Sequence, residues 1–153
     1  MNVFLSDEQT EPVDAPGLRR LAELALDFEG FPPDTEMSVV LVDEAQIARY
    51  NDRFMGRHGP TDVLAFPLLE LRPGAVPVRT PDDPPIGVGD VFLCPAEIRT
   101  RAEAEGYDYP DLLFLMLVHG ILHLLGYDHD EGGAADAMSQ REDELLALVG
   151  KVV

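Results

Sequence analysis

The chain of 153 residues lacks several features that would mark a secreted or membrane protein. It has one cysteine, Cys94, and so cannot form an internal disulfide, which fits a reducing compartment. Its first residues, MNVFLSDEQTEPVD, lack the basic start and apolar centre of a signal peptide. Its longest apolar run, Leu112 to Val118, is far too short to span a bilayer. We therefore expect a cytoplasmic protein with no membrane partner.

Basic residues are also scarce. The chain has 11 Lys and Arg against 29 Asp and Glu, a net charge of -18, which argues against loose binding to nucleic acid and gives no reason to expect a DNA partner. A nucleic-acid substrate is still compatible with this charge, because the local field at a site matters more than the total. Arg49, Arg53 and Arg57 repeat every four residues. They either balance acids on a solvated helix face or form a local anion-binding rim.

The apolar pattern predicts a single α+β domain over residues 1–153, with a small mixed four-stranded sheet and about five helices. Strand patterns fall at Val3–Leu5, Met37–Val42, Thr61–Phe66 and Val91–Cys94. Helical patterns run from Asp14 to Gly30, from Asp43 to about Phe54, over Ala96–Glu105, from Asp108 to about Leu125, and over Ala134–Val149. Residues 72–89 are rich in proline and glycine and predict a long irregular loop.

For three of these helices the sequence predicts which residues are buried. The helix that begins at Asp108 is apolar on nearly every side, so we expect it at the centre of the domain. The second helix is expected to turn Ile47, Tyr50 and Phe54 inward and its arginines outward. The last helix should bury one side that carries Met138, Leu145 and Leu148.

The most informative segment is His119-Gly-Ile-Leu-His123-Leu-Leu-Gly126-Tyr-Asp-His129, which contains three of the four histidines. His119 and His123 are four residues apart, so on a helix their side chains share one face. Gly126 can adopt a positive φ, which lets the helix end and His129 return towards the pair. Three nitrogen ligands and a water form the open zinc arrangement of hydrolytic enzymes. We predict one zinc ion at the end of the central helix, although residue type also allows nickel, copper or manganese.

The same spacing occurs in the metalloprotease signature HExxHxxGxxH, in which a glutamate after the first histidine is the general base. This chain has Gly120 at that position. The metal ligands are kept and the proton carrier is lost, which disfavours peptide hydrolysis by that mechanism. A shallow space beside Gly120 could admit a bulky substrate.

The chain strongly resembles the YbeY family of bacterial rRNA-maturation endoribonucleases. The histidine segment matches the family signature HGxLHLxGYDH, and Pro60–Pro67, PTDVLAFP, resembles the family segment PTDVLSFP. Gly89-Asp90-Val91 matches a strand entry of the family, and Met138 and Glu142 fall where the family tends to place a methionine and a glutamate. The resemblance covers roughly residues 51–144.

The resemblance implies a cytoplasmic, zinc-dependent endoribonuclease that acts on single-stranded RNA, with His119, His123 and His129 as the metal ligands. It also implies maturation of the 16S rRNA 3′ end, ribosome quality control and the small ribosomal subunit as a partner. The family usually has an arginine where this chain has Met55, and Arg57 lies two positions later. Whether Arg57 takes the place of that arginine is left open by the sequence. We expect the nearby arginines, Arg57 first, to neutralise developing phosphate charge as zinc-activated water attacks phosphorus.

Two other functions remain open. One is a ribosome-assembly factor that binds RNA without cutting it and whose zinc is structural. The other is a metal hydrolase of peptides or small amides, which Gly120 disfavours.

Several single residues have two interpretations each. Asp128 could accept a hydrogen bond from a ligand histidine such as His129, or it could shape the turn after Gly126. The remaining candidates are Asp62 and Asp90, as site or turn residues, Cys94, as a buried hydrophobe or a fourth ligand, and His58, as a loop residue or a proton carrier.

Overall fold

The computed structural model describes residues 1–128 and 132–151. Within them the strands are β1 (Asn2–Asp7), β2 (Glu36–Leu41), β3 (Val63–Pro67) and β4 (Gly87–Leu93). The helices are α1 (Ala15–Phe28), α2 (Glu44–Met55), α3 (Pro95–Glu105), α4 (Tyr109–Leu124) and α5 (Gly132–Ala147). The predicted α+β class, with a four-stranded sheet and five helices, is therefore confirmed for the described part of the chain.

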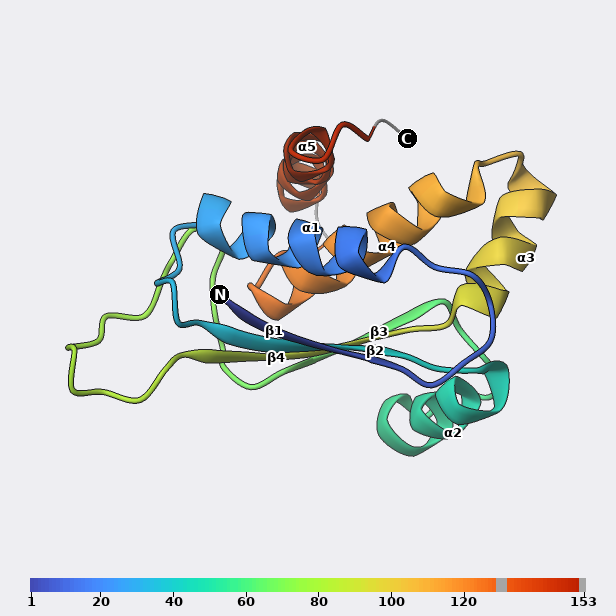
Figure 1. The fold of residues 1–153 in the computed structure, drawn as a ribbon, viewed down its shortest axis with the longest axis horizontal. Helices are drawn as coiled ribbons and strands as arrows, with labels where there is room; N and C mark the ends of the chain where they lie inside the picture. The colour runs from blue at the N-terminus through green and yellow to red at the C-terminus, as the bar shows by residue number, and fades with distance from the viewer. Residues whose placement is uncertain (129–131, 152–153) are drawn as a thin grey trace.

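The sheet is mixed, as expected, and has the strand order β1-β2-β4-β3. β1, β2 and β4 are parallel, whereas β3 runs antiparallel to β4, with Ala65 opposite Val91. This order leaves β1 and β3 as the two edge strands. Helices α1 and α4 lie over one face of the sheet and α2 lies under the other, as Figure 1 shows. Within the described residues, β3 therefore pairs with β4 alone.

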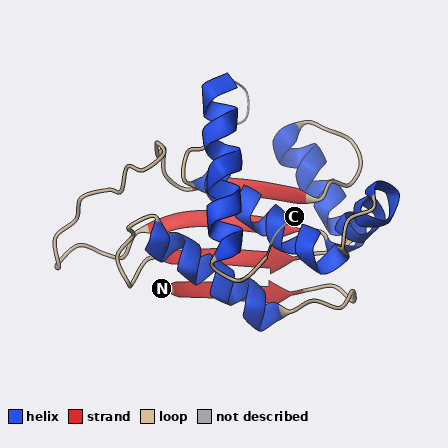
Figure 2. Cartoon of the chain, turned by 90° about the horizontal axis from the view of Figure 1, so that it is seen from above, coloured by secondary structure: helices blue, strands red, loops and turns tan. Residues whose placement is uncertain are grey.

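Helix α4 is the centre of the core, which confirms the prediction from its apolar sequence. It packs against β3 and β4 and also contacts α1, α3 and α5. Figure 2 looks down on the helices that cover this face of the sheet. The largest side chains that α4 buries completely or almost completely are Leu112, Leu113, Leu117, Ile121 and Leu122. Because neighbours enclose it, side chains near its C-terminal end are held in defined positions.

Capping residues begin the helices where the sequence predicts. The Asp14 carboxylate accepts a hydrogen bond from the Gly17 amide at the start of α1. Asp43 and Gln46 form a reciprocal capping box at the start of α2. The side chain of Asp108 accepts from the Asp111 amide and starts α4. Each of these contacts joins residues three positions apart, which is why the local sequence was enough to locate them.

Some predicted boundaries and faces are wrong. β4 begins at Gly87, four residues before the predicted Val91, because it pairs with β2 along the whole of that strand. Phe54 is 55% exposed, since it lies in the last turn of α2, although its ring still touches other aromatic rings. Leu148 lies beyond the end of α5 and is 40% exposed, whereas Met138 and Leu145 are buried as expected. Among the described residues, no helix is both long and apolar enough to cross a membrane.

Candidate metal centre and adjoining cleft

His119 and His123 point their Nε2 atoms at each other on the last turns of α4. The two atoms are 3.0 Å apart, and the rings cross at 79° with centroids 4.5 Å apart. Two nitrogens that each lie about 2.0–2.1 Å from a tetrahedral zinc ion are separated by about 3.3 Å. The pair therefore fits two ligand positions on one small metal ion, as the spacing predicts.

Glu142 from α5 orients the first of these histidines. Its Oε2 lies 3.2 Å from Nδ1 of His119, and the residue is only 8% exposed. When His119 is neutral and donates its Nδ1 proton to this carboxylate, the lone pair of its ring lies on Nε2. A carboxylate behind a ligand histidine fixes the ring orientation and raises the basicity of the ligand nitrogen. The sequence placed Glu142 in the family pattern but did not indicate this contact with His119.

Helix α4 ends shortly before Gly126, where a turn was predicted to return His129 towards the histidine pair. Gly126 has φ of +96°, and a Cβ at this position would lie 2.1 Å from the carbonyl oxygen of Leu71. His129 itself lies outside the described residues, so its role as a ligand stays a prediction. In the described segments taken alone, no group of three or more His, Cys, Asp or Glu could hold a metal ion. Two of the three predicted ligands are therefore brought together here.

A cavity of about 510 Å³ opens beside His123. It is lined by Asn51, Met55, Arg57, Thr61, Val63, Leu64, Ala65, Pro67 and His123. The structure therefore brings Arg57 to the same cavity as His123. The role of Arg57 in binding phosphate stays a prediction. This convergence joins the end of α2, the edge of the sheet and the end of α4, which are far apart in the sequence.

The outer edge of β3 forms one wall of this cavity. The Cys94 amide donates to the Asp62 carbonyl, and the Leu68 amide donates to the Val88 carbonyl. In an antiparallel pair the backbone groups alternate between the two sides, so those of Val63 and Ala65 face away from β4. The cavity thus offers backbone donors and acceptors beside a guanidinium and an imidazole.

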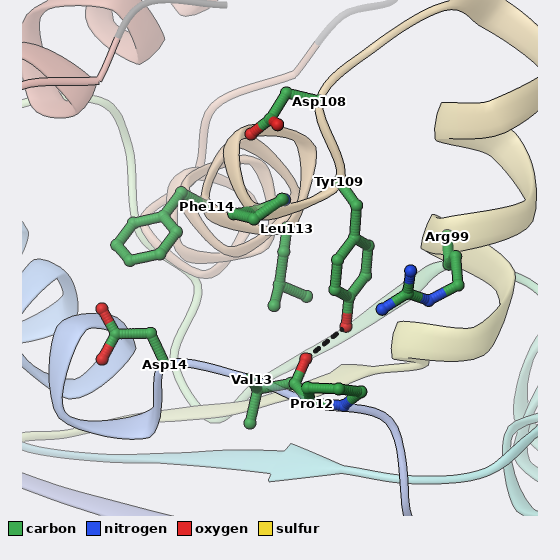
Figure 3. A pocket seen from close by; sticks show the side chains of 9 residues that line it. Pro12, Val13, Asp14, Arg99, Asp108, Tyr109, Leu113 and Phe114 are labelled. Atoms are coloured by element: carbon green, nitrogen blue, oxygen red, sulfur yellow. Dashed lines mark hydrogen bonds between the residues drawn. The ribbon is translucent and has the colours of Figure 1, made fainter.

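A second cavity, of about 500 Å³, lies at the opposite end of α4 (Figure 3). Its polar groups are already engaged: the Tyr109 hydroxyl donates to the Pro12 carbonyl, and Arg99 pairs with Glu11. The Arg99 guanidinium also lies 4.2 Å from the centre of the Tyr109 ring. None of its lining residues is a histidine. The candidate chemistry therefore belongs to the cavity beside His123.

The predicted free space beside Gly120 does not exist. A Cβ at this residue would lie 2.6 Å from Cγ1 of Val91 and 3.1 Å from Cγ2 of Val63. The position is filled by the sheet on which α4 packs. Gly120 therefore permits a close approach of helix and sheet instead of admitting substrate.

Two aspartates proposed as site residues are engaged elsewhere. Asp62 forms an ion pair of 2.7 Å with Arg101, and that hydrogen bond is the main cause of the raised pKa of the guanidinium. Asp90 lines a different hollow, together with Phe4 and Ser38. Neither lines the cavity beside His123.

Cys94 and His58 belong to other parts of the structure, and for Asp128 only its exposure is described. Cys94 is completely buried in a cluster with Val42 and Ile47, which confirms the interpretation of Cys94 as a buried hydrophobic residue. Burial raises the pKa of its thiol to about 11. The side chain of His58 is 95% exposed and lies 3.1 Å from an Asp52 oxygen, as a loop residue would. Asp128 is exposed, and its predicted contact with His129 falls outside the described residues.

Fold and site together define an α+β protein with a histidine pair on its central helix, backed by a glutamate and facing an arginine-lined cavity. The sequence model of the family Endoribonuclease YbeY matches residues 5–150. The chain therefore belongs to the YbeY family.

Individual relatives agree with this assignment. The Endoribonuclease YbeY of Acidothermus cellulolyticus is 46% identical over 147 residues, which cover 95% of this chain and 90% of that protein. The one from Thermobifida fusca is also 46% identical over 147 residues, covering 96% of this chain and 93% of the relative. A solution structure of a Thermotoga maritima protein is similar in fold, with a TM-score of 0.60 and 24% identity over 95% of this chain and 90% of that one.

Proposed function

We propose that this chain is a zinc-dependent endoribonuclease that hydrolyses single-stranded RNA. Membership of a family named for endoribonuclease activity supports an RNA-cleaving hydrolase. The observation that carries the proposal is the convergence of the two Nε2 atoms, 3.0 Å apart, at a cavity that Arg57 also lines. Imidazole nitrogens suit zinc, and an arginine suits the phosphodiester on which the enzyme acts.

Each residue of the site has a separate task in this proposal. His119, His123 and His129 would hold one zinc ion, which supplies a Lewis acid and lowers the pKa of a bound water to about 7. Arg57 binds the phosphate and neutralises charge that develops on its oxygens. Glu142 keeps the proton of His119 on Nδ1. The outward-facing amides of Val63 and Ala65 can donate to phosphate or ribose oxygens and hold the strand in register.

The proposed cellular role follows the family resemblance. We place this activity in the maturation of the 16S rRNA 3′ end and in ribosome quality control, with the small ribosomal subunit as the partner and the cytoplasm as the location. Single-stranded RNA is favoured over a duplex because its backbone can bend along the edge of β3. The general base is left open, and a 2′-hydroxyl nucleophile is compatible with the same residues.

The proposal is tested by metal analysis and RNA cleavage on the purified chain and two variants. His123→Ala should lose stoichiometric zinc and metal-dependent cleavage of single-stranded RNA together. His58→Ala, which removes an exposed histidine outside the cavity, should keep both. Sequencing the product ends then distinguishes attack by water from attack by a 2′-hydroxyl. RNA binding without metal-dependent cutting by the wild type would contradict the proposal and favour an assembly factor.

A further inference from the structure

We propose that Phe54 stacks a base of the single-stranded RNA where the strand leaves the cavity, beside the arginines of α2. This inference rests on the proposed function and adds a contact outside the cavity. It makes α2 a second RNA-binding element, separate from the histidine pair.

The ring of Phe54 is both exposed and firmly supported. More than half of the residue, 55%, is accessible to solvent. Beneath it, the Tyr50 ring lies nearly parallel at 6.1 Å, and the Phe66 ring meets it edge-on at 5.5 Å. Phe92 contacts both supporting rings at 4.8 and 5.4 Å and completes a cluster of four aromatic side chains. A ring held in this way can receive a base without losing further side-chain freedom.

One cation lies over this ring on a protein that is otherwise strongly acidic. The Arg53 guanidinium is 5.3 Å from the centre of the Phe54 ring, and Arg49 and Arg57 lie four residues before and after Arg53 in the sequence. Within residues 1–128 and 132–151, ion pairs occupy Arg79, Arg99, Arg101, Arg141 and Lys151. The other six arginines form no ion pair there, and three of them, Arg49, Arg53 and Arg57, fall within nine residues of sequence around Phe54. In the described residues, three cations without an ion pair are therefore close together in the sequence at the C-terminal part of α2 and just beyond it, in a chain of net charge -18. This arrangement favours an anionic ligand.

The platform adjoins the candidate active site. Met55, the next residue after Phe54, is 42% exposed and lines the cavity that contains Arg57 and His123. The Phe54 ring also packs edge-on against Phe66, which lies between the cavity-lining residues Ala65 and Pro67 on β3. These two contacts place the ring close to the cavity, where a strand that leaves it can reach the ring.

Single-stranded RNA fits these features better than a duplex or a protein segment. In a duplex the base faces are stacked on one another, so an exposed aromatic ring cannot reach them. An apolar protein segment would use the ring but gain nothing from the unpaired arginines. Stacking on an aromatic side chain accepts any base, because every base has a π-face. We therefore expect this contact to add affinity without sequence preference.

The test measures binding of two fluorescent single strands of equal length to the metal-loaded protein. One is a 2′-O-methyl oligoribonucleotide, checked on a gel for integrity after each titration. The other has the same backbone with abasic positions, so that it keeps the phosphates and lacks the bases. Phe54→Ala should weaken binding of the complete strand on the order of tenfold and leave the abasic strand unaffected.

A second variant reports stacking directly. The chain contains no tryptophan, so Phe54→Trp introduces one fluorophore and keeps an aromatic platform. It should bind the complete strand as tightly as wild type, and its emission should be quenched on binding. Phe4→Ala and Phe4→Trp are matched controls, because Phe4 is 57% exposed and lies on β1, the opposite edge strand. They should show neither the loss nor the quenching.

The outcomes separate this inference from the proposed function. A wild-type chain that neither binds nor cleaves single-stranded RNA overturns both. Normal cleavage, with the Phe54→Ala chain binding the complete strand as wild type does, overturns only the stacking contact. An equal loss for the complete and the abasic strand also overturns it, because the ring would then act on the backbone or on the fold.

Discussion

Glu142 on α5 lies 3.2 Å from Nδ1 of His119 on α4, and this contact joins the C-terminal helix to the histidine pair. The carboxylate is 8% exposed, so solvent competes weakly for the hydrogen bond. A carboxylate in this position selects the tautomer in which His119 offers Nε2 as a ligand. The last helix therefore belongs to the candidate site, although it carries none of the predicted ligands.

Loss of the Glu142 carboxylate should weaken metal binding. We expect Glu142→Ala to lower zinc affinity by about 10- to 100-fold, because His119 would lose the group that orients it. Competition with a chromophoric chelator measures this directly. Asp143→Ala removes the neighbouring exposed carboxylate on α5 and should leave the affinity unchanged. Equal zinc affinity in Glu142→Ala and wild type would refute the orienting role.

Removal of the Arg57 charge should impair RNA cleavage. We expect Arg57→Gln to lower kcat/KM for single-stranded RNA on the order of tenfold, since solvent screens an exposed guanidinium more than a buried one. Arg57→Lys should recover part of the loss, because it restores the charge without the planar donor geometry. His58→Gln, next along the chain but outside the cavity lining, is the control. An unchanged kcat/KM in Arg57→Gln would remove Arg57 from the site.

A methyl group at residue 120 should destabilise the fold. Gly120→Ala places a Cβ where Cγ1 of Val91 would be 2.6 Å away, and overpacking of this kind costs about 1–3 kcal/mol. Urea unfolding measures the free energy of unfolding for each variant. Val91→Ala should compensate for Gly120→Ala in the double variant, which a double-mutant cycle reveals as a favourable coupling. Strictly additive losses would argue against the steric explanation.

The Glu97 carboxyl should make stability depend on pH. Burial raises the pKa of Glu97 above the ordinary 4.5. Its hydrogen bond with Glu44 and the negative charges of Glu44 and Asp62 raise this pKa further. The folded state then binds the proton more tightly than the unfolded state. This contribution to stability is complete below pH 4.5 and is lost as the pH rises through the raised folded pKa.

Glu97→Gln should remove that dependence. Its Tm relative to wild type should increase between about pH 4 and pH 7, because the variant avoids burying a charge at the higher pH. Glu103→Gln, an exposed change on the same helix, serves as the control. The same Tm difference for Glu97→Gln at both pH values would show that Glu97 does not titrate abnormally.

Much of the architecture was predictable because its signals are local. Asp14 and Asp43 cap their own helices, and Gly126 has the positive φ that the end of α4 requires. The spacing of His119 and His123 was enough to place both rings on one helical face. Such features depend on residues a few positions apart, so one sequence contains them in full.

Other features escaped prediction because they depend on contacts between distant segments. The helical pattern of α2 assigns Phe54 to the inner face. In the structure the residue lies in the last turn of the helix, and more than half of its surface is accessible to solvent. The sequence showed that Gly120 lacks the glutamate side chain of the metalloprotease signature. It did not show that Val91 and Val63 pack against this position. Hydrophobic periodicity indicates which side of a helix is apolar. It does not indicate how much of that side the neighbouring elements cover.

The sequence by itself determined the elements, the mixed α+β class and the histidine pair, because turn chemistry, capping and helical spacing act over a few residues. Only the tertiary structure decided that Arg57 shares a cavity with His123 and that Glu142 supports His119. Those contacts arise when β3 and α5 pack against α4 and the end of α2 lies at the edge of the sheet, and this packing depends on the shapes of side chains across the whole core.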